Sequence, residues 1–237
     1  MSKKAVCLIS GGLDSCVATW VAKQEGYTLY AISFDYGQLH KRELASAKSI
    51  AEAAGVKDHI IFTVDLQRFG GSSLLDQKQP VPQNRSFQEI GKKGIPSTYV
   101  PARNTIFLSL ALAWAETLDA DAIFIGAHAT DSSGYPDCRP EYIQAYQAMS
   151  NQATRRGVEG KPILIQAPLL QFTKTEIIKK GVGLKAPLGL TWSCYQGGRT
   201  ACGRCDSCLL RLKGFQDIGI PDPLPYSTYP PWYTQKK

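Results

Sequence analysis

Two common phosphate-binding signatures are absent from this 237-residue chain. It has no GxxxxGK segment followed by Ser or Thr, so it lacks the lysine with which Walker-type NTPases reach the β- and γ-phosphates. It has no GxGxxG segment either, which excludes the fingerprint of dinucleotide-binding folds. A nucleotide site in this chain must therefore be of another type.

Long apolar runs and long charged runs are also absent. No apolar run approaches the roughly 20 residues that a spanning helix needs, and the first residues lack the apolar region and cleavage site of a signal peptide. The net charge is +7, but the basic residues occur in scattered pairs, so nucleotide use explains it as well as RNA binding does. We expect a cytoplasmic globular protein without a membrane partner or a stable nucleic-acid partner.

The segment SGGLDS at residues 10–15 lies between an apolar run over 5–9 and a helical pattern over 16–24. A strand, a glycine turn and a helix together present free backbone N–H groups and a positive helix end to phosphate. Ser10 and Ser15 can add hydroxyl donors. Asp14 would repel phosphate unless it holds a cation, which favours bound Mg²⁺. A tight turn with a capping Asp or Ser is the structural alternative.

The order of apolar patterns predicts an α/β fold with a parallel sheet covered by helices on both faces. Strand patterns alternate with helix patterns, which is typical of right-handed parallel crossovers. Residues 67–97 show no periodicity, so they form either a functional lid or a tolerated surface insertion. The expected strands are 5–9, 27–34, 59–64, 122–126 and 162–165, and the expected helices are 16–24, 42–54, 105–118, 141–154, one starting near 174, and 209–216.

Two basic residues stand at predicted helix starts, where the helix dipole disfavours positive charge. Arg103 precedes the apolar helix over 105–118, and Lys174 follows Thr173 at the start of a later helix. A bound phosphate would remove the conflict in both places. A solvated arginine is the alternative for Arg103, and a capping box formed by Thr173 and Glu176 accounts for Glu176 without a functional role.

Residues 128–139 are rich in hydrogen-bonding side chains and follow a predicted strand. Their composition suits a flat polar heterocycle, with Tyr135 stacking on the ring and carboxylates accepting from ring N–H groups. The candidates are Asp131, Tyr135, Asp137 and Arg139. A turn-rich connection is the structural alternative, and His128 is more typical of a structural histidine.

Four of the seven cysteines fall within one short segment: Cys194, Cys202, Cys205 and Cys208. The absence of an export signal argues against a disulfide framework. Two overlapping CxxC steps turn three thiolates toward one point, and the fourth cysteine completes a tetrahedron. This compact spacing favours one structural Zn²⁺ per chain, although an iron–sulfur cluster also uses four cysteines.

The motifs together resemble a known family. SGGLDS after the first strand resembles the PP-loop signature of the N-type ATP pyrophosphatases, which cleave ATP between the α- and β-phosphates. The segments SxYVPARNxxFLS and DSSGYPDCRPEY, with the four cysteines, resemble the QueC family of 7-cyano-7-deazaguanine synthases over nearly the whole chain. The resemblance implies a three-layer PP-loop (adenine nucleotide alpha hydrolase-like) domain over 1–185 and a zinc-binding helical region over 186–237.

The resemblance also implies an activity and a set of site residues. It implies an ATP-dependent carbon–nitrogen ligase that converts 7-carboxy-7-deazaguanine and ammonia to the nitrile in queuosine biosynthesis, acting as a homodimer. Asp14, Ser15, Arg103 and Lys174 would be catalytic, and Asp131, Tyr135, Asp137 and Arg139 would bind the deazapurine. ATP would contact Ile9, Ser10, Gly11, Gly12, Leu13, Asp14, Ser15, Phe34, Asp35 and Arg103.

Two other functions fit parts of the sequence. A PP-loop tRNA thiolase or lysidine-type enzyme would need a tRNA-binding domain or a reactive persulfide cysteine, and the chain leaves no room for such a domain. A zinc-knuckle RNA-binding module predicts a basic aromatic stripe near the cysteines, where only Arg199, Arg204 and Tyr195 are found.

Overall fold

A single parallel sheet organises the computed structural model, which describes residues 2–76, 78–90, 94–128 and 134–234. Its five strands run in the order β3-β2-β1-β4-β5, and every adjacent pair is parallel. In the centre, Val6 pairs with Tyr30 on one side and with Ile123 on the other. The strands are β1 (Lys4–Leu8), β2 (Thr28–Asp35), β3 (His59–Thr63), β4 (Ala122–Phe124) and β5 (Leu164–Gln166).

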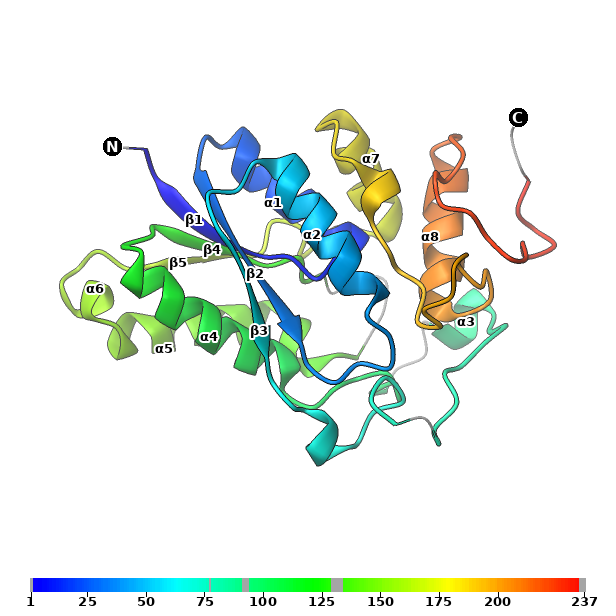
Figure 1. The fold of residues 1–237 in the computed structure, drawn as a ribbon, viewed down its shortest axis with the longest axis horizontal. Coiled ribbons are helices and arrows are strands. Elements are labelled where there is room, and N and C mark those ends of the chain that lie inside the picture. The colour runs from blue at the N-terminus through cyan, green and yellow to red at the C-terminus, as the bar shows by residue number, and fades with distance from the viewer. Residues whose placement is uncertain (1, 77, 91–93, 129–133, 235–237) are drawn as a thin grey trace.

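Helices cover both faces of this sheet, so the predicted three-layer α/β architecture is confirmed (Figure 1). The helices α1, α2 and α7 lie on one face, and α4 and α5 lie on the other. The described helices are α1 (Leu13–Gln24), α2 (Arg42–Ala54), α3 (Phe87–Ile90), α4 (Arg103–Thr117), α5 (Pro140–Ala153), α6 (Arg155–Val158), α7 (Lys174–Gly183) and α8 (Asp206–Asp217), with single-turn 3₁₀ helices at Gln67–Phe69, Pro136–Cys138 and Leu188–Leu190.

The predicted element ranges are close to those observed, and the largest differences lie at helix starts. The helix α1 begins at Leu13 rather than residue 16, because the extended backbone of Gly12 ends the loop and half of the SGGLDS segment joins the helix. The helix α8 begins at Asp206 rather than residue 209, directly after Cys205. The capping box of Thr173 and Glu176 at the start of α7 is present as predicted.

The segment after α7 crosses the carboxyl edge of the sheet and forms a third apolar cluster. Trp192 lies in this cluster with the four cysteines of the predicted metal site. A later segment of the chain folds back on this cluster, since Leu224 and Tyr226 are buried in it and Trp232 packs against it. Figure 1 shows α8 and α3 beside one another at this end of the molecule. None of the described helices is long and apolar enough to cross a membrane.

Candidate active site

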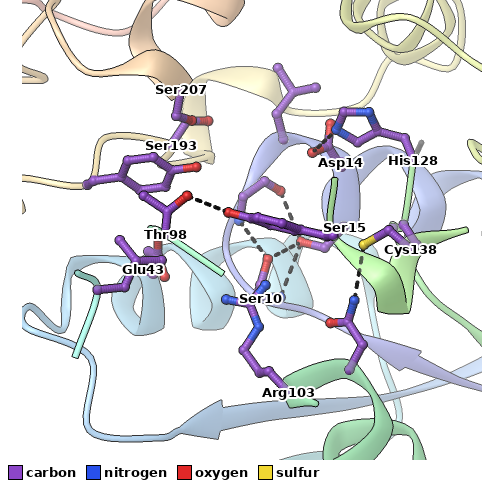
Figure 2. A pocket seen from close by; sticks show the side chains of 18 of the residues that line it. Ser10, Asp14, Ser15, Glu43, Thr98, Arg103, His128, Cys138, Ser193 and Ser207 are labelled. Carbon is purple, nitrogen blue, oxygen red and sulfur yellow. Dashed lines mark hydrogen bonds and ion pairs between the residues drawn. The ribbon is translucent and has the colours of Figure 1, made fainter. Parts of the chain in front are cut away.

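The loop between β1 and α1 is built to receive an anion. Ser15 Oγ accepts hydrogen bonds from the backbone N–H of Ser10 at 3.2 Å and from Ser10 Oγ at 3.1 Å, and it donates to Gly12 O at 3.0 Å. These bonds fix both hydroxyls at the start of α1 (Figure 2). The first N–H groups of α1 have no partner within the helix, so the loop offers backbone donors, hydroxyls and a positive helix end in one place.

Gly11 lets α2 approach this loop closely. Its φ is +88°, and a Cβ at this position would lie 2.0 Å from the carbonyl oxygen of Glu43 in the first turn of α2. On the other side, the N–H of Trp192 donates to Gly11 O at 2.8 Å. The loop is therefore held between α2 and the segment that leads to the cysteines.

Asp14 lies between two basic side chains. Lys174 Nζ is 2.6 Å from one carboxylate oxygen, and His128 Nε2 is 3.4 Å from the other. Lys174 Nζ is also 3.1 Å from His128 Nε2. Burial alone would raise the pKa of Asp14, but the positive charge of Lys174, with His128, holds it well below its usual range. The carboxylate stays ionised, and it ties α1 to the start of α7.

Arg103 reaches the same site from the opposite face of the sheet. It begins α4, its guanidinium lies 5.6 Å from the centre of the Tyr36 ring, and its Nη1 donates to the Tyr36 hydroxyl at 3.4 Å. The structure thus brings both predicted cations, Arg103 and Lys174, to one cavity that SGGLDS also lines.

This cavity has a volume of about 480 Å³. One wall is the phosphate loop with the carboxyl ends of β1, β2 and β4. A second wall comes from the long loop over 67–97, including Arg85 and Ile95, and a third from the cysteine segment, including Ser193 and Ser207 (Figure 2). The size suits a small-molecule site, which commonly occupies several hundred Å³.

The predicted heterocycle-binding residues do not all lie in this cavity. Tyr135 lines it, and its hydroxyl is 2.7 Å from Thr98 Oγ1. Asp137 and Arg139 instead line a separate shallow pocket, where the Asp137 carboxylate accepts the Asn104 N–H at 3.0 Å. Asp131 lies outside the described residues.

Of the predicted ATP contacts, most line the cavity, but two do not. Ile9, Ser10, Gly12, Leu13, Asp14, Ser15, Phe34 and Arg103 all line it. Gly11 faces α2 as described above. Asp35 ends β2 at the expected edge, but its carboxylate binds Lys41 at 2.8 Å and it is not among the lining residues.

The four cysteines converge on one point. Their sulfur atoms all lie within 4.8 Å of one another, and those of Cys202 and Cys208 are 3.9 Å apart. Tetrahedral Zn–S bonds of about 2.3 Å place the sulfurs about 3.8 Å apart, so the arrangement fits a four-thiolate metal site. Backbone N–H groups also point at the sulfurs: Gln196 donates to Cys194 Sγ at 3.4 Å and Arg204 to Cys202 Sγ at 3.3 Å.

The long loop docks on this cysteine cluster. Gln83 forms an antiparallel bridge with Cys205, and the Asn84 N–H donates to Arg204 O at 2.8 Å. Arg85 then forms an ion pair with Asp206, the first residue of α8. The cysteine segment therefore holds part of the 67–97 loop against the cavity, and a functional role of this loop stays a prediction.

Sequence reasoning did not single out Glu43, Ser193 or Asp206, and it considered Tyr195 only for RNA binding, although all four line the cavity. Glu43 looks like an ordinary first-turn acid of an amphipathic helix. Asp206 stands inside the CDSC motif, where the cysteines dominate the interpretation. Only the tertiary fold shows that these residues line the same cavity as the phosphate loop.

The parallel sheet, the SGGLDS loop at its carboxyl edge and the adjoining cavity define an α/β enzyme of the PP-loop class. The chain belongs to the QueC family, because the family described as queuosine biosynthesis protein QueC matches residues 4–219.

Relatives named 7-cyano-7-deazaguanine synthase are similar over nearly their whole length. The one from Thermosynechococcus vestitus is 52% identical over 97% of this chain and 98% of its own. The Nostoc relative is 54% identical over 94% of this chain and 97% of its own. The one from Desulfatibacillum aliphaticivorans is 55% identical over 94% of this chain and 97% of its own.

Proposed function

We propose that this protein is an ATP-dependent ligase that converts 7-carboxy-7-deazaguanine and ammonia to 7-cyano-7-deazaguanine. The relatives carry the name of this product. The observation that carries the proposal is the cavity in which a phosphate loop without a Walker lysine faces Arg103 and Lys174. Such a site suits adenylate formation, because two cations can neutralise the charge that develops at the α-phosphate and on the pyrophosphate.

The chemistry explains why ATP is required. A carboxylate is a poor electrophile because oxide is a very poor leaving group. One carboxylate oxygen therefore attacks the α-phosphorus of ATP, pyrophosphate leaves, and the resulting acyl adenylate reacts with ammonia to give the amide and AMP. Activation of the amide oxygen by a second ATP allows loss of AMP and of the N–H protons, which leaves the nitrile. The protein positions the reactants and stabilises charge.

Each group of cavity residues has a proposed role in this scheme. Ser10, Ser15 and the N–H groups at the start of α1 bind the leaving pyrophosphate. Arg103 and Lys174 bind the α-phosphate from opposite faces of the sheet. Tyr135 contacts the deazapurine ring. Asp137 and Arg139 lie in the separate pocket, so they serve the substrate only by supporting the segment that carries Tyr135.

The donor sets differ in how well they fit the two expected metals. Mg²⁺ is commonly bound by one or two carboxylates together with substrate phosphates, and Asp14 is the carboxylate beside the phosphate loop. Both of its oxygens contact basic groups, so Asp14 would hold Mg²⁺ by exchanging its contact with Lys174. The four converging thiolates fit Zn²⁺ with no open coordination position, which gives that metal a structural role.

Several expectations stay predictions alongside this function. These are a boundary between an ATP-binding domain over 1–185 and a metal-binding region over 186–237, a homodimer, a cytoplasmic location, and the lack of a stable nucleic-acid partner.

Mass spectrometry tests the activity. The protein is incubated with 7-carboxy-7-deazaguanine, Mg-ATP and ¹⁵N-labelled ammonia, and the expected products are the ¹⁵N-nitrile, AMP and pyrophosphate. Asp14→Asn should slow product formation by about 100-fold or more, because the variant lacks the loop's negative charge for the metal. Formation of ADP and phosphate without AMP would refute adenylation, and near-native turnover by Asp14→Asn would refute the role of Asp14.

A further inference from the structure

Glu43 is a carboxylate of the cavity to which the scheme above gives no task. It lies in the first turn of α2, and its own backbone carbonyl is packed against Gly11. The backbone of Glu43 is therefore held at a fixed place beside the phosphate loop. It lines the cavity on the side of Thr98 and Arg103, whereas Asp14 and His128 lie on the far side (Figure 2).

The other described carboxylates that line the cavity have partners. Asp14 binds two basic side chains, Asp206 forms an ion pair with an arginine, and Glu89 accepts two hydrogen bonds in the first turn of α3. No described residue donates a hydrogen bond to the Glu43 carboxylate. Among these acids, Glu43 is therefore the one whose oxygens remain available to a ligand.

The surroundings of Glu43 suit reversible proton uptake. Burial raises its pKa from 4.5 to about 7, against the opposing positive charge of Arg103 on α4. The other titratable groups that interact electrostatically with the Glu43 carboxylate are Tyr36, Tyr195 and the thiol of Cys194. A base is most effective when its pKa lies near the working pH.

The proposed reaction needs such a base. When the ammonia nitrogen attacks the carbonyl carbon of the acyl adenylate, the new C–N bond leaves a positive –NH₃⁺ group that must lose a proton before AMP departs as the amide forms. In the second half-reaction, the adenylated amide must lose both remaining N–H protons as the C–O bond to AMP breaks and the nitrile forms. Neither phosphate-binding cation can accept these protons while it remains charged.

We propose, on the basis of the function proposed above, that the Glu43 carboxylate binds the incoming ammonia and takes the proton that its nitrogen loses. This assigns an ammonia subsite to the side of the cavity between Thr98 and Arg103. Arg103 adjoins this side of the cavity, whereas Lys174 lies with Asp14 on the far side. Ammonia bound at Glu43 would therefore approach a substrate in the cavity from the side opposite Asp14.

The test separates adenylation from the steps that need a base. Native protein and Glu43→Gln are compared in three assays: carboxylate-dependent exchange of labelled pyrophosphate into ATP without ammonia, nitrile formation with ammonia, and hydroxamate formation with hydroxylamine. In Glu43→Gln, exchange should stay within about twofold of native, while nitrile formation should fall by about 100-fold. Hydroxamate formation should fall far less, because the hydroxylamine adduct is more acidic and can lose its proton to water.

Glu52→Gln is the matched control, since Glu52 lies on the same helix but is exposed to solvent. It should behave as native protein in all three assays. Equal losses of exchange and nitrile formation in Glu43→Gln would overturn the assignment, because Glu43 would then serve ATP or the carboxylate. Nitrile formation within about threefold of native would overturn it as well. Native protein without carboxylate-dependent exchange would refute the proposed function itself, and the assignment with it.

Discussion

Removing Asp222 should destabilise the protein strongly, because it would leave a buried arginine without its counter-charge. Arg211 on α8 and the side chain of Asp222 are 2% and 1% exposed, and they form a two-pronged ion pair at 2.8 and 3.0 Å. Asp222 also accepts the Tyr226 hydroxyl at 2.6 Å and the Leu224 N–H at 3.0 Å. The pair therefore joins α8 to the final segment of the chain.

The expected size of the effect follows from the burial of both partners. Removing one member of a buried ion pair costs about 3–5 kcal/mol, and in a chain of this size each kcal/mol lowers the melting temperature by about 2–4 °C. We expect Asp222→Ala to lower the free energy of unfolding by about 3–5 kcal/mol and the melting temperature by roughly 6–20 °C. Urea unfolding followed by circular dichroism and calorimetry measure the two quantities.

A matched control and a double variant test the reasoning behind this number. Glu159 pairs with Arg155 at 3.6 Å on the surface, with side chains 51% and 63% exposed, so Glu159→Ala should cost less than about 0.5 kcal/mol. Replacing Arg211 by Met and Asp222 by Leu together should recover most of the loss, because no unpaired charge remains. A loss within about 1 kcal/mol of native in Asp222→Ala would refute the argument.

Three further predictions follow from the site. Tyr135→Ala should keep its affinity for ATP but lose its affinity for 7-carboxy-7-deazaguanine, as measured by calorimetric titration of each ligand. An equal loss of affinity for both ligands would mean that the tyrosine is structural. Cys205→Ser should lower metal content and melting temperature together, since structural zinc contributes about 10 kcal/mol of apparent folding free energy in small peptides; a variant that loses the metal but melts at the native temperature would contradict the structural role. Burial raises the pKa of Glu43 from 4.5 to about 7, so the folded state retains a proton that the unfolded chain releases between these values. Stability should therefore fall as pH rises from about 4.5 to 7, and Glu43→Gln should flatten this slope by up to about 3 kcal/mol in urea unfolding at several pH values; an unchanged profile would contradict the raised pKa.

The parts of the fold that sequence predicted correctly are those with local causes. The run before SGGLDS is apolar because β1 is buried on both faces of the sheet. The helix α2 follows the predicted range 42–54 because its apolar residues recur at helical spacing and Gly55 ends it in a left-handed conformation. Ser10 and Ser15 lie together in the loop, because they are within a few positions of each other, and their binding of phosphate stays a prediction.

The placement of other candidate residues depends on contacts between distant segments. Asp137 and Arg139 follow Tyr135 closely, and the sequence predicts that all three face one ligand, but after the 3₁₀ turn at Pro136–Cys138 the later two line another pocket. Glu43 carries no local mark of function. Its place in the cavity depends on the close approach of α2 to Gly11, which residue patterns within α2 do not encode.

The structure also connects the predicted metal site to the cavity proposed as the active site. The cysteine spacing predicts a structural Zn²⁺, and nothing in the residue pattern links the cysteines to SGGLDS, which lies about 180 residues or more before them. Yet Trp192 donates to Gly11 O, and the cysteine segment bridges the loop that carries Arg85. Losing the metal would therefore release two walls of the cavity at once. The proposed structural metal is therefore compatible with an activity that depends on it, since the backbone contacts that bind the cysteine segment to the loop also shape the cavity proposed as the active site.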